Sequence, residues 1–174
     1  AAKKVKRFVV MGGSIAVGYD GKPKPEVEWN IKLDIPAAKA VFASGLPLAV
    51  VPLDATATLK LEKKQRDALF EARSMLTYQV QNLYELWDKE TPVLFDPATV
   101  LTVFDDKHFT WKEQRLEIID TGMSLVKEGK ANARVATAVK GDAVLAEIVK
   151  RLRDHGEGID PPLQDNRDSR VIPD

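Results

Sequence analysis

Short apolar runs alternate with stretches of helical periodicity along the chain, a pattern typical of helices packed around a sheet. Residues 5–11 form an apolar, β-branched run that stops at two glycines, and residues 48–51 form a second run enclosed by prolines. Between them, residues 36–44 open on a proline, keep helical spacing and stop at Gly45, which predicts a helix. A strand, a helix and a strand joined by short connections predict a parallel crossover.

The second half of the chain predicts further helices and strands. Residues 60–90 repeat apolar positions at spacings of three and four, which predicts two helices broken near Arg73-Ser74, with the apolar stripe in the core or at an interface. The elements after them are a helix at 97–104, strands at 115–119 and 134–139 separated by a turn at 120–122, and a helix at 142–152. Together these elements predict an α/β fold with a Rossmann-like open mixed sheet and flanking helices.

Length and composition indicate one domain and exclude two kinds of partner. A chain of 174 residues with 44% hydrophobic content can bury one core, so we expect residues 1–153 to form one domain and the polar residues 154–174 an irregular tail. Basic and acidic residues balance at 26 each, and no apolar run nears the roughly 20 residues that span a bilayer. Neither nucleic acid nor a membrane is therefore an expected partner. The compartment is left open, with the cytoplasm favoured.

The residue types that are missing or rare restrict the chemistry. The chain has no cysteine, which excludes disulfides, thiolate metal sites and a cysteine nucleophile. Its two histidines, His108 and His155, lie far apart without ligand spacing, so a metal here should be held by oxygen ligands. With balanced charge, a small or neutral ligand is the expected partner.

A long loop rich in glycine and proline, residues 12–27, leads to Glu28-Trp29-Asn30. Loops of this length inside a domain tend to be functional or disordered. In a short extended segment, Glu28 and Asn30 would lie on one side and Trp29 on the other, and a carboxylate beside an amide suits vicinal hydroxyls. Residue types alone still favour a solvated loop with one buried tryptophan.

Asp96 stands directly before the helix predicted at 97–104. Spacing alone favours an ordinary N-cap, whereas the functional alternative is an oxygen ligand for Ca²⁺ or Mg²⁺. One carboxylate is not enough for calcium, which takes about six to eight oxygens, so other ligands would have to come from elsewhere. Asp54 and Thr56, just after the second strand, are expected to make turn hydrogen bonds.

Several of these segments occur together, in the same order and approximate spacing, in one known family. They are Val9 to Gly13, Glu28-Trp29-Asn30 with Asp34 after it, Val51 to Thr56, and Phe95-Asp96-Pro97-Ala98, with Leu116 to Gly129 following. The set resembles the inosine-uridine-preferring nucleoside hydrolases. This resemblance implies hydrolysis of the N-glycosidic bond of a ribonucleoside, or a related riboside, with a calcium ion that binds the ribose 2′- and 3′-hydroxyls and a water.

The resemblance also implies roles for particular residues. Asp96 would be a ligand of calcium and of ribose, Asn30 would hydrogen-bond ribose, and Glu28 would reach the 5′-hydroxyl side. Met11 would line the ribose pocket, and Trp29 would fill the aromatic position between the two polar residues.

Three departures from the family pattern affect the expected activity. Phe95 stands where many members have a histidine proposed to protonate the leaving base, and phenylalanine can stack on a base but cannot donate a proton. Tyr19 stands where an asparagine is usual, which leaves the nucleobase preference open. The aspartate-rich segment that supplies most calcium ligands and the catalytic base, Asp-x-Asp-x-Gly-x-Asp-Asp, has no counterpart in this chain.

The resemblance therefore covers the C-terminal half of the family domain, over residues 1–153. The chain also opens without an initiator methionine, as though it began partway through a longer protein. We expect it to carry no catalytic residue, to be inactive alone, and to associate with a complementary N-terminal fragment or with copies of itself. The alternative is a non-catalytic module derived from the family, which binds a ribosyl ligand or a protein partner.

Overall fold

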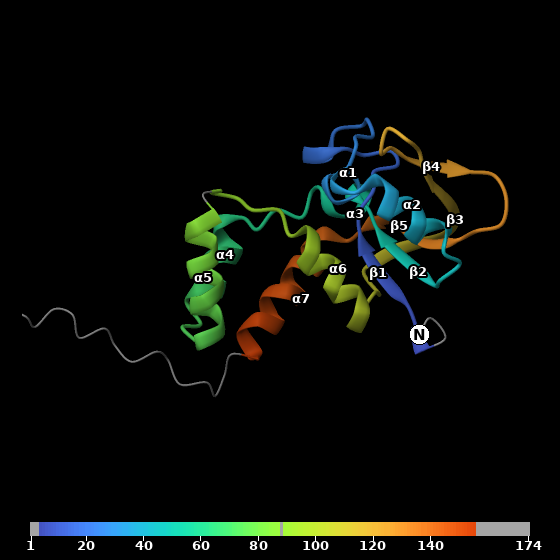
Figure 1. Ribbon diagram of the computed structural model, residues 1–174. Helices are drawn as coiled ribbons and strands as arrows, with labels where there is room; N and C mark the ends of the chain where they lie inside the picture. The colour runs from blue at the N-terminus through green and yellow to red at the C-terminus, as the bar shows by residue number, and fades with distance from the viewer. Residues whose placement is uncertain (1–3, 88, 156–174) are drawn as a thin grey trace, which may run out of the picture.

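The computed structural model describes residues 4–87 and 89–155 and arranges them as a five-stranded sheet flanked by helices (Figure 1). The strands are β1 (Phe8–Met11), β2 (Leu48–Val51), β3 (Phe109–Ile118), β4 (Ser124–Lys127) and β5 (Ala133–Val139). The helices are α1 (Trp29–Leu33), α2 (Ile35–Ala43), α3 (Leu53–Thr56), α4 (Lys63–Phe70), α5 (Met75–Trp87), α6 (Phe95–Phe104) and α7 (Gly141–Asp154), with a 3-10 helix η2 (Tyr19–Gly21).

The sheet is open and mixed, as the sequence predicts. Its strand order is β1-β2-β5-β3-β4. β1 pairs in parallel with β2, from Phe8 opposite Leu48 to Met11 opposite Val51, and β2 pairs in parallel with β5. β3 runs antiparallel to both β5 and β4. The predicted parallel crossover is therefore confirmed, and the carboxyl ends of β1 and β2 share one edge of the sheet.

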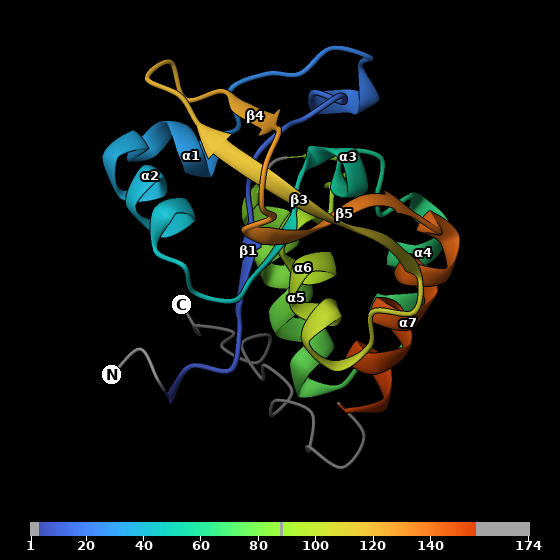
Figure 2. The same ribbon diagram turned by 90° about the vertical axis from the view of Figure 1, so that its right-hand side faces the viewer.

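Helices cover both faces of the sheet (Figure 2). On one face, Ile31 of α1 and Phe42 of α2 pack with Val50 of β2. On the other face, α3, α6 and α7 pack with Val51, the next residue of the same strand. Successive strand residues point to opposite faces, and both faces are covered here. β2 is therefore apolar and buried along its whole length.

The predicted pair of helices in residues 60–90 is confirmed, with α4 and α5 on either side of the expected break. Arg73 has a φ of 50° there, in the left-handed region. Ser74 and Thr77 then exchange hydrogen bonds: the Ser74 N–H donates to Thr77 Oγ1 at 2.9 Å, and the Thr77 N–H donates to Ser74 Oγ at 3.2 Å. This reciprocal pairing gives partners to backbone N–H groups at the start of α5 that have none within the helix.

The structure corrects the predicted strands near residues 109–127. β3 begins at Phe109 rather than at residue 115, and β4 was not predicted at all. In the missed part of β3 only Phe109 to Lys112 alternate between apolar and polar residues, and this run is too short to predict a strand of ten residues. A register shift between Thr110 and Trp111 also interrupts its pairing with β5. Its pairing is supported instead by neighbours on β5, where the Arg134 guanidinium lies 4.3 Å from the centre of the Trp111 ring.

The C-terminal prediction is tested only in part. α7 continues to Asp154, two residues beyond the predicted helix and into the predicted tail. Residues 156–174 lie outside the described part of the chain. Among the described residues, no helix is long and apolar enough to cross a membrane.

Candidate functional site

A tight glycine turn follows β1 and begins the candidate site. Gly13 has a φ of +89°, and its carbonyl accepts a hydrogen bond from the Leu53 N–H at 2.9 Å. A Cβ at Gly13 would lie 2.9 Å from Ser124 Oγ, a buried hydroxyl that has no hydrogen-bond partner among the described residues. Both the dihedral angle and the close approach require glycine here.

Glu28 ties this turn to the start of α1. Its carboxylate is buried, with only 2% of the residue exposed. Oε1 accepts from the Asn30 N–H at 3.0 Å, and Oε2 accepts from the Ile31 N–H at 3.2 Å and from the Gly13 N–H at 3.3 Å. Glu28 is therefore the N-cap of α1 and anchors the turn after β1 at the same time.

This geometry corrects two expectations for Glu28-Trp29-Asn30. The segment is not extended, because the helix begins at Trp29 and the Glu28 carboxylate binds its first free N–H groups. The alternative of a buried tryptophan is also wrong, since Trp29 is 60% exposed. Glu28 and Asn30 therefore do not lie side by side as neighbours on one strand face. Glu28 is instead the N-cap of α1, and Asn30 lies in the first turn of that helix.

Asn30 reaches from α1 to the end of β1. Its side-chain nitrogen Nδ2 donates to the Met11 carbonyl at 3.2 Å and lies 3.3 Å from Met11 Sδ. The side chain of Asn30 is exposed, and Met11 is half-buried. Two of the residues expected to bind a riboside are thus in direct contact at the carboxyl edge of the sheet.

Tyr19, from η2, connects this cluster with α6. Its hydroxyl accepts a hydrogen bond from the Trp29 N–H at 2.8 Å. Its ring meets the Phe95 ring edge to face, with centroids 6.2 Å apart and an interplanar angle of 80°. Burial raises the pKa of the Tyr19 hydroxyl, the Trp29 N–H opposes that shift, and the nearby carboxylates of Glu28 and Glu26 raise the pKa further.

The role of Tyr19 as a connector between two segments was not predicted. The sequence identified the tyrosine only as a substitution at this position of the family pattern. The glycines on either side, Gly18 and Gly21, predict a turn at Tyr19 but not the partners of its side chain. A Cβ on Gly18 would come within 2.5 Å of the Lys24 carbonyl oxygen. This turn can therefore close only around glycine.

Asp54 holds the loop that begins the site. Its Oδ2 accepts from the Ile15 N–H at 2.9 Å, and its Oδ1 accepts from the Ala16 N–H at 2.8 Å. Thr56 Oγ1 donates to the Pro52 carbonyl at 3.0 Å. The expected local hydrogen bond is therefore found at Thr56, whereas the bonds of Asp54 are not those of its own turn but reach the loop after β1, 38 and 39 positions away.

Phe95 and Asp96 lie in the first turn of α6. The predicted N-cap at Asp96 is wrong by two positions, because α6 begins at Phe95 and the cap position is Leu94. Asp96 is exposed, whereas Phe95 is half-buried against Tyr19. The exposed carboxylate of Asp96 therefore has no capping role in α6.

The described residues do not by themselves make a calcium site. Within residues 4–87 and 89–155, no three His, Cys, Asp or Glu side chains are grouped so that they could hold a metal ion. Asp96 offers carboxylate oxygens, yet calcium takes about six to eight oxygen ligands. Any metal bound at Asp96 would need most of its ligands from another polypeptide segment.

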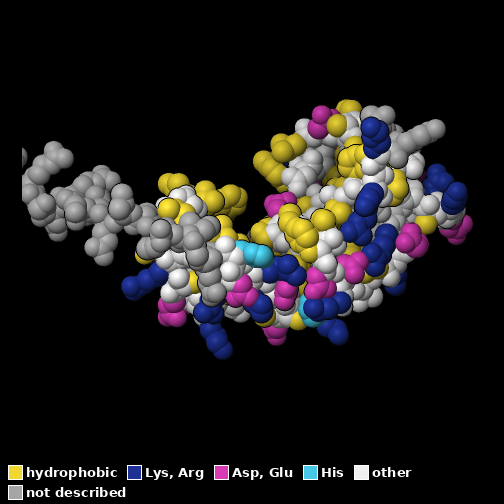
Figure 3. All heavy atoms as spheres, turned by 90° about the horizontal axis from the view of Figure 1, so that it is seen from below, with side chains coloured by type: hydrophobic (Ala, Val, Ile, Leu, Met, Phe, Trp, Pro, Cys, Tyr) yellow, Lys and Arg dark blue, Asp and Glu magenta, His cyan; other side chains and the backbone are white. Residues whose placement is uncertain are grey.

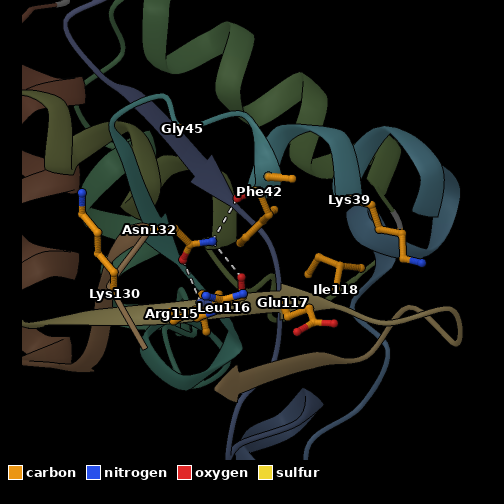
Figure 4. A pocket seen from close by; sticks show the side chains of 10 residues that line it. Lys39, Phe42, Gly45, Arg115, Leu116, Glu117, Ile118, Lys130 and Asn132 are labelled. Atoms are coloured by element: carbon orange, nitrogen blue, oxygen red, sulfur yellow. Dashed lines mark hydrogen bonds between the residues drawn. The ribbon is translucent and has the colours of Figure 1, made fainter. Parts of the chain in front are cut away.

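Two hollows lie away from the Met11–Asn30 contact. One, of about 540 Å³, lies between α2 and β3 (Figure 4). The side chain of Asn132 makes hydrogen bonds there with backbone groups of Phe42 and Leu116 (Figure 4). The side chains of Lys39 and Lys130 extend in different directions and do not converge on one point. The other is an apolar groove of about 760 Å³ between α5, α6 and α7, and Asp96 lines it.

Comparison with known proteins agrees with the resemblance. A model of the inosine-uridine preferring nucleoside hydrolases matches residues 1–146. The pyrimidine-specific ribonucleoside hydrolase RihA of Shigella boydii serotype 4 is 27% identical over 169 residues, which cover 86% of this chain and 53% of that protein. The RihA protein of Escherichia coli O7:K1 matches with the same identity and coverage.

Two solved structures share the fold. The purine-preferring ribonucleoside hydrolase from Gardnerella vaginalis aligns with a TM-score of 0.74 at 20% identity, over 88% of this chain and 55% of its own. The plant nucleoside hydrolase PpNRh1 aligns with a TM-score of 0.71 at 24% identity, over 87% of this chain and 55% of its own. The chain thus spans about half the length of the relatives it matches. It belongs to the inosine-uridine preferring nucleoside hydrolase family.

Proposed function

We propose that this chain forms one wall of the riboside site of a nucleoside hydrolase, and that a complementary polypeptide supplies the other wall. The observation that carries the proposal is the convergence on Tyr19 of two segments from the family pattern. The Glu28-Trp29-Asn30 segment meets Tyr19 through the Trp29 N–H, and the Phe95-Asp96 segment meets it through the Phe95 ring. The reaction is hydrolysis of the N-glycosidic bond of a ribonucleoside or related riboside.

The exposed groups of this wall suit the recognition of ribose. Asn30 presents a side-chain amide beside Met11, and Asp96 presents an exposed carboxylate. An amide both donates and accepts hydrogen bonds, and a carboxylate accepts them, which suits adjacent sugar hydroxyls. Calcium, when bound, would polarise the attacking water and hold those hydroxyls. Asp96 is the residue proposed as its ligand from this chain.

Glu28 has a different place in the proposal. Three backbone N–H groups already donate to its carboxylate, and burial removes it from open solvent. A carboxylate has about four acceptor sites, and the Tyr19 hydroxyl is also a hydrogen-bond partner of Glu28, so the 5′-hydroxyl of a bound riboside would take the place of Tyr19 at this carboxylate. Glu28 therefore serves first to position Asn30 and second to receive the substrate.

The leaving base needs separate consideration, because Phe95 has no proton to give. Its ring can contact a base by stacking, and Tyr19 supports it from the side. Substrates whose leaving group departs without protonation should therefore be cleaved best. The names of the relatives differ in base preference, one pyrimidine-specific and one purine-preferring, and we assign neither preference to this chain.

The proposal is tested by assembling the chain with a complement. The complement is the part of the Escherichia coli O7:K1 relative that has no counterpart in this chain. We expect calcium-dependent turnover of nitrophenyl riboside by the assembly, loss of that turnover in Asp96→Ala, and weaker calcium binding in the same variant. Asp120→Ala, which removes an exposed aspartate paired with Lys39, is the matched control. Unchanged turnover in Asp96→Ala would remove Asp96 from the site.

A second experiment tests the account of the leaving group. Phe95→His returns the residue type that the family resemblance implies at this position. In the assembly, this variant should speed the cleavage of natural nucleosides more than that of nitrophenyl riboside, because general acid catalysis is worth about 10²–10⁴-fold only where the leaving group needs a proton. An equal effect on both substrates contradicts this account.

A non-catalytic riboside-binding module is the second candidate. It is favoured by one observation, that the described residues contain no group of three potential metal ligands. This alternative predicts that the chain binds ribose or a riboside without calcium. Equilibrium dialysis of labelled inosine against the chain, with and without a chelator, separates the two candidates.

A further inference from the structure

The hydroxyl of Tyr19 contacts two polar groups at the start of α1. It accepts a hydrogen bond from the Trp29 N–H at 2.8 Å, and it is also a hydrogen-bond partner of the Glu28 carboxylate. A carboxylate only accepts hydrogen bonds, so the phenol proton of Tyr19 is donated to Glu28. Burial and the nearby carboxylates raise the pKa of Tyr19, which keeps that proton on the hydroxyl.

The Glu28 carboxylate has no acceptor site left while Tyr19 donates to it. Three backbone N–H groups, those of Gly13, Asn30 and Ile31, already donate to its two oxygens. Tyr19 is the fourth partner, and a carboxylate has about four acceptor sites. A sugar hydroxyl can therefore bind this buried carboxylate only where the Tyr19 hydroxyl leaves it.

The turn that carries Tyr19 opposes such a movement. The Gly18 N–H donates to the Lys22 carbonyl at 2.9 Å, and the Lys22 N–H donates to the Tyr19 carbonyl at 3.3 Å. Gly21 packs so closely that a Cβ there would lie 3.0 Å from Thr58 Cγ2. The backbone of Tyr19 is thus fixed on both sides, and its hydroxyl can leave Glu28 only by rotation of the side chain.

Rotation of the Tyr19 side chain would also break its other contacts. The ring would lose its edge-to-face contact with Phe95, and the hydroxyl would lose its hydrogen bonds to Trp29 and Glu28. Loss of one hydrogen bond to a charged group corresponds to about 10- to 100-fold in an equilibrium constant. A riboside with a 5′-hydroxyl must displace Tyr19 and binds more weakly by that factor, whereas a riboside without this hydroxyl leaves Tyr19 in place.

The surroundings of Tyr19 offer apolar contacts. Phe95 and Met11 are half-buried, and Trp29 is 60% exposed. Hydrophobic side chains also lie on both sides of a hollow in the face seen from below (Figure 3). A methyl group can pack against such side chains, whereas a hydroxyl that is buried without a partner is disfavoured.

We infer that Tyr19 determines specificity at the 5′ position, so that the completed site prefers 5′-deoxyribosides to ribosides with a 5′-hydroxyl. This inference rests on the proposed function and names the substrate class of that site. The C5′ methyl group lies against the rings of Tyr19 and Phe95, and the Tyr19 hydroxyl stays on Glu28. Hydrolysis adds the elements of water across the N-glycosidic bond and releases the base and 5-deoxyribose.

The experiment compares two pairs of probes on the chain mixed with the complement defined above, in calcium. Equilibrium dialysis measures the binding of methyl riboside and methyl 5-deoxyriboside, whose methoxy group leaves too poorly for turnover. Steady-state kinetics measures kcat/KM for nitrophenyl riboside and nitrophenyl 5-deoxyriboside. We expect the 5-deoxy probe of each pair to be favoured by about 10- to 100-fold.

Two variants and one control assign this preference to Tyr19. Tyr19→Phe removes the hydroxyl and frees an acceptor site of Glu28, so it should abolish the preference. Tyr19→Asn returns the residue type that the family resemblance implies, and it should favour the probe with the 5-hydroxyl. Tyr84→Phe is the matched control, because it removes a hydroxyl that donates to the Glu90 carbonyl at 2.9 Å, and it should keep the preference.

The outcomes separate specificity from function. The inference is overturned if the parent chain binds both methyl ribosides equally or prefers the one with the 5-hydroxyl, if Tyr19→Phe keeps the preference, or if Tyr84→Phe abolishes it. Turnover of nitrophenyl riboside without a preference rejects the inference and upholds the proposed function. A preference in dialysis without turnover upholds the role of Tyr19 and rejects hydrolysis, and absence of both binding and turnover rejects both.

Discussion

The side-chain amide of Asn30 donates a hydrogen bond to the backbone carbonyl of Met11 across 3.2 Å. This single contact joins the N-terminus of α1 to the carboxyl end of β1. It also places an amide where the outer edge of the sheet ends, so the residues expected to meet ribose are held by the fold before any ligand binds. Preorganisation of this kind reduces the entropy cost of binding.

Glu28→Gln should lower the free energy of unfolding by about 1–3 kcal/mol, because a side-chain NH₂ would replace one of two oxygens that accept buried backbone N–H groups. Urea unfolding followed by circular dichroism measures the change. Glu26→Gln, two positions earlier and half-buried, should change it much less. Equal effects of the two variants would mean that the Glu28 carboxylate does not anchor the glycine turn.

Tyr19 gives a pH dependence whose direction follows from its raised pKa. The folded protein holds the phenol proton more tightly than the unfolded chain, so this contribution to stability is fully present below the unfolded pKa of about 10 and falls as pH rises above it. The parent chain should therefore lose more stability than Tyr19→Phe when the pH is raised through this range. Parallel losses in the two proteins would contradict the raised pKa of the Tyr19 hydroxyl.

Asp54→Ala should loosen the loop between β1 and η2 without unfolding the sheet. The carboxylate accepts from the Ile15 and Ala16 N–H groups, and hydrogen bonds to charged groups contribute about 1.5–3 kcal/mol, or about tenfold or more in local opening. Hydrogen exchange at these two amides should speed up by that factor. Asp67→Ala, which removes a partner of Lys63 on α4, should leave both rates unchanged.

The general architecture was predictable because its signals are local. The apolar runs at β1 and β2, the helix between them and the break near Arg73 each follow from residue type and spacing. β4 and the first half of β3 were not predictable in the same way, since they are specified by neighbouring strands rather than by their own alternation.

The segments that meet near Tyr19 were recognisable in the sequence, but their geometry was not. Met11, Asn30 and Phe95 belong to recognisable segments, and the structure brings those segments together. The extended arrangement expected for Glu28 was wrong, because helix-capping by glutamate depends on which backbone N–H groups tertiary structure leaves free. The Tyr19–Phe95 contact joins residues 76 positions apart, and no local pattern encodes such a pair.

The central claim is that the riboside site is divided between this chain and a complementary half. The most direct measurement is calcium-dependent turnover of nitrophenyl riboside by the chain alone, the complement alone and the two mixed at equal concentration. The account predicts no turnover above background for either part and clear turnover for the mixture, abolished by a chelator. Turnover by the chain alone, at the rate of the mixture, would contradict it.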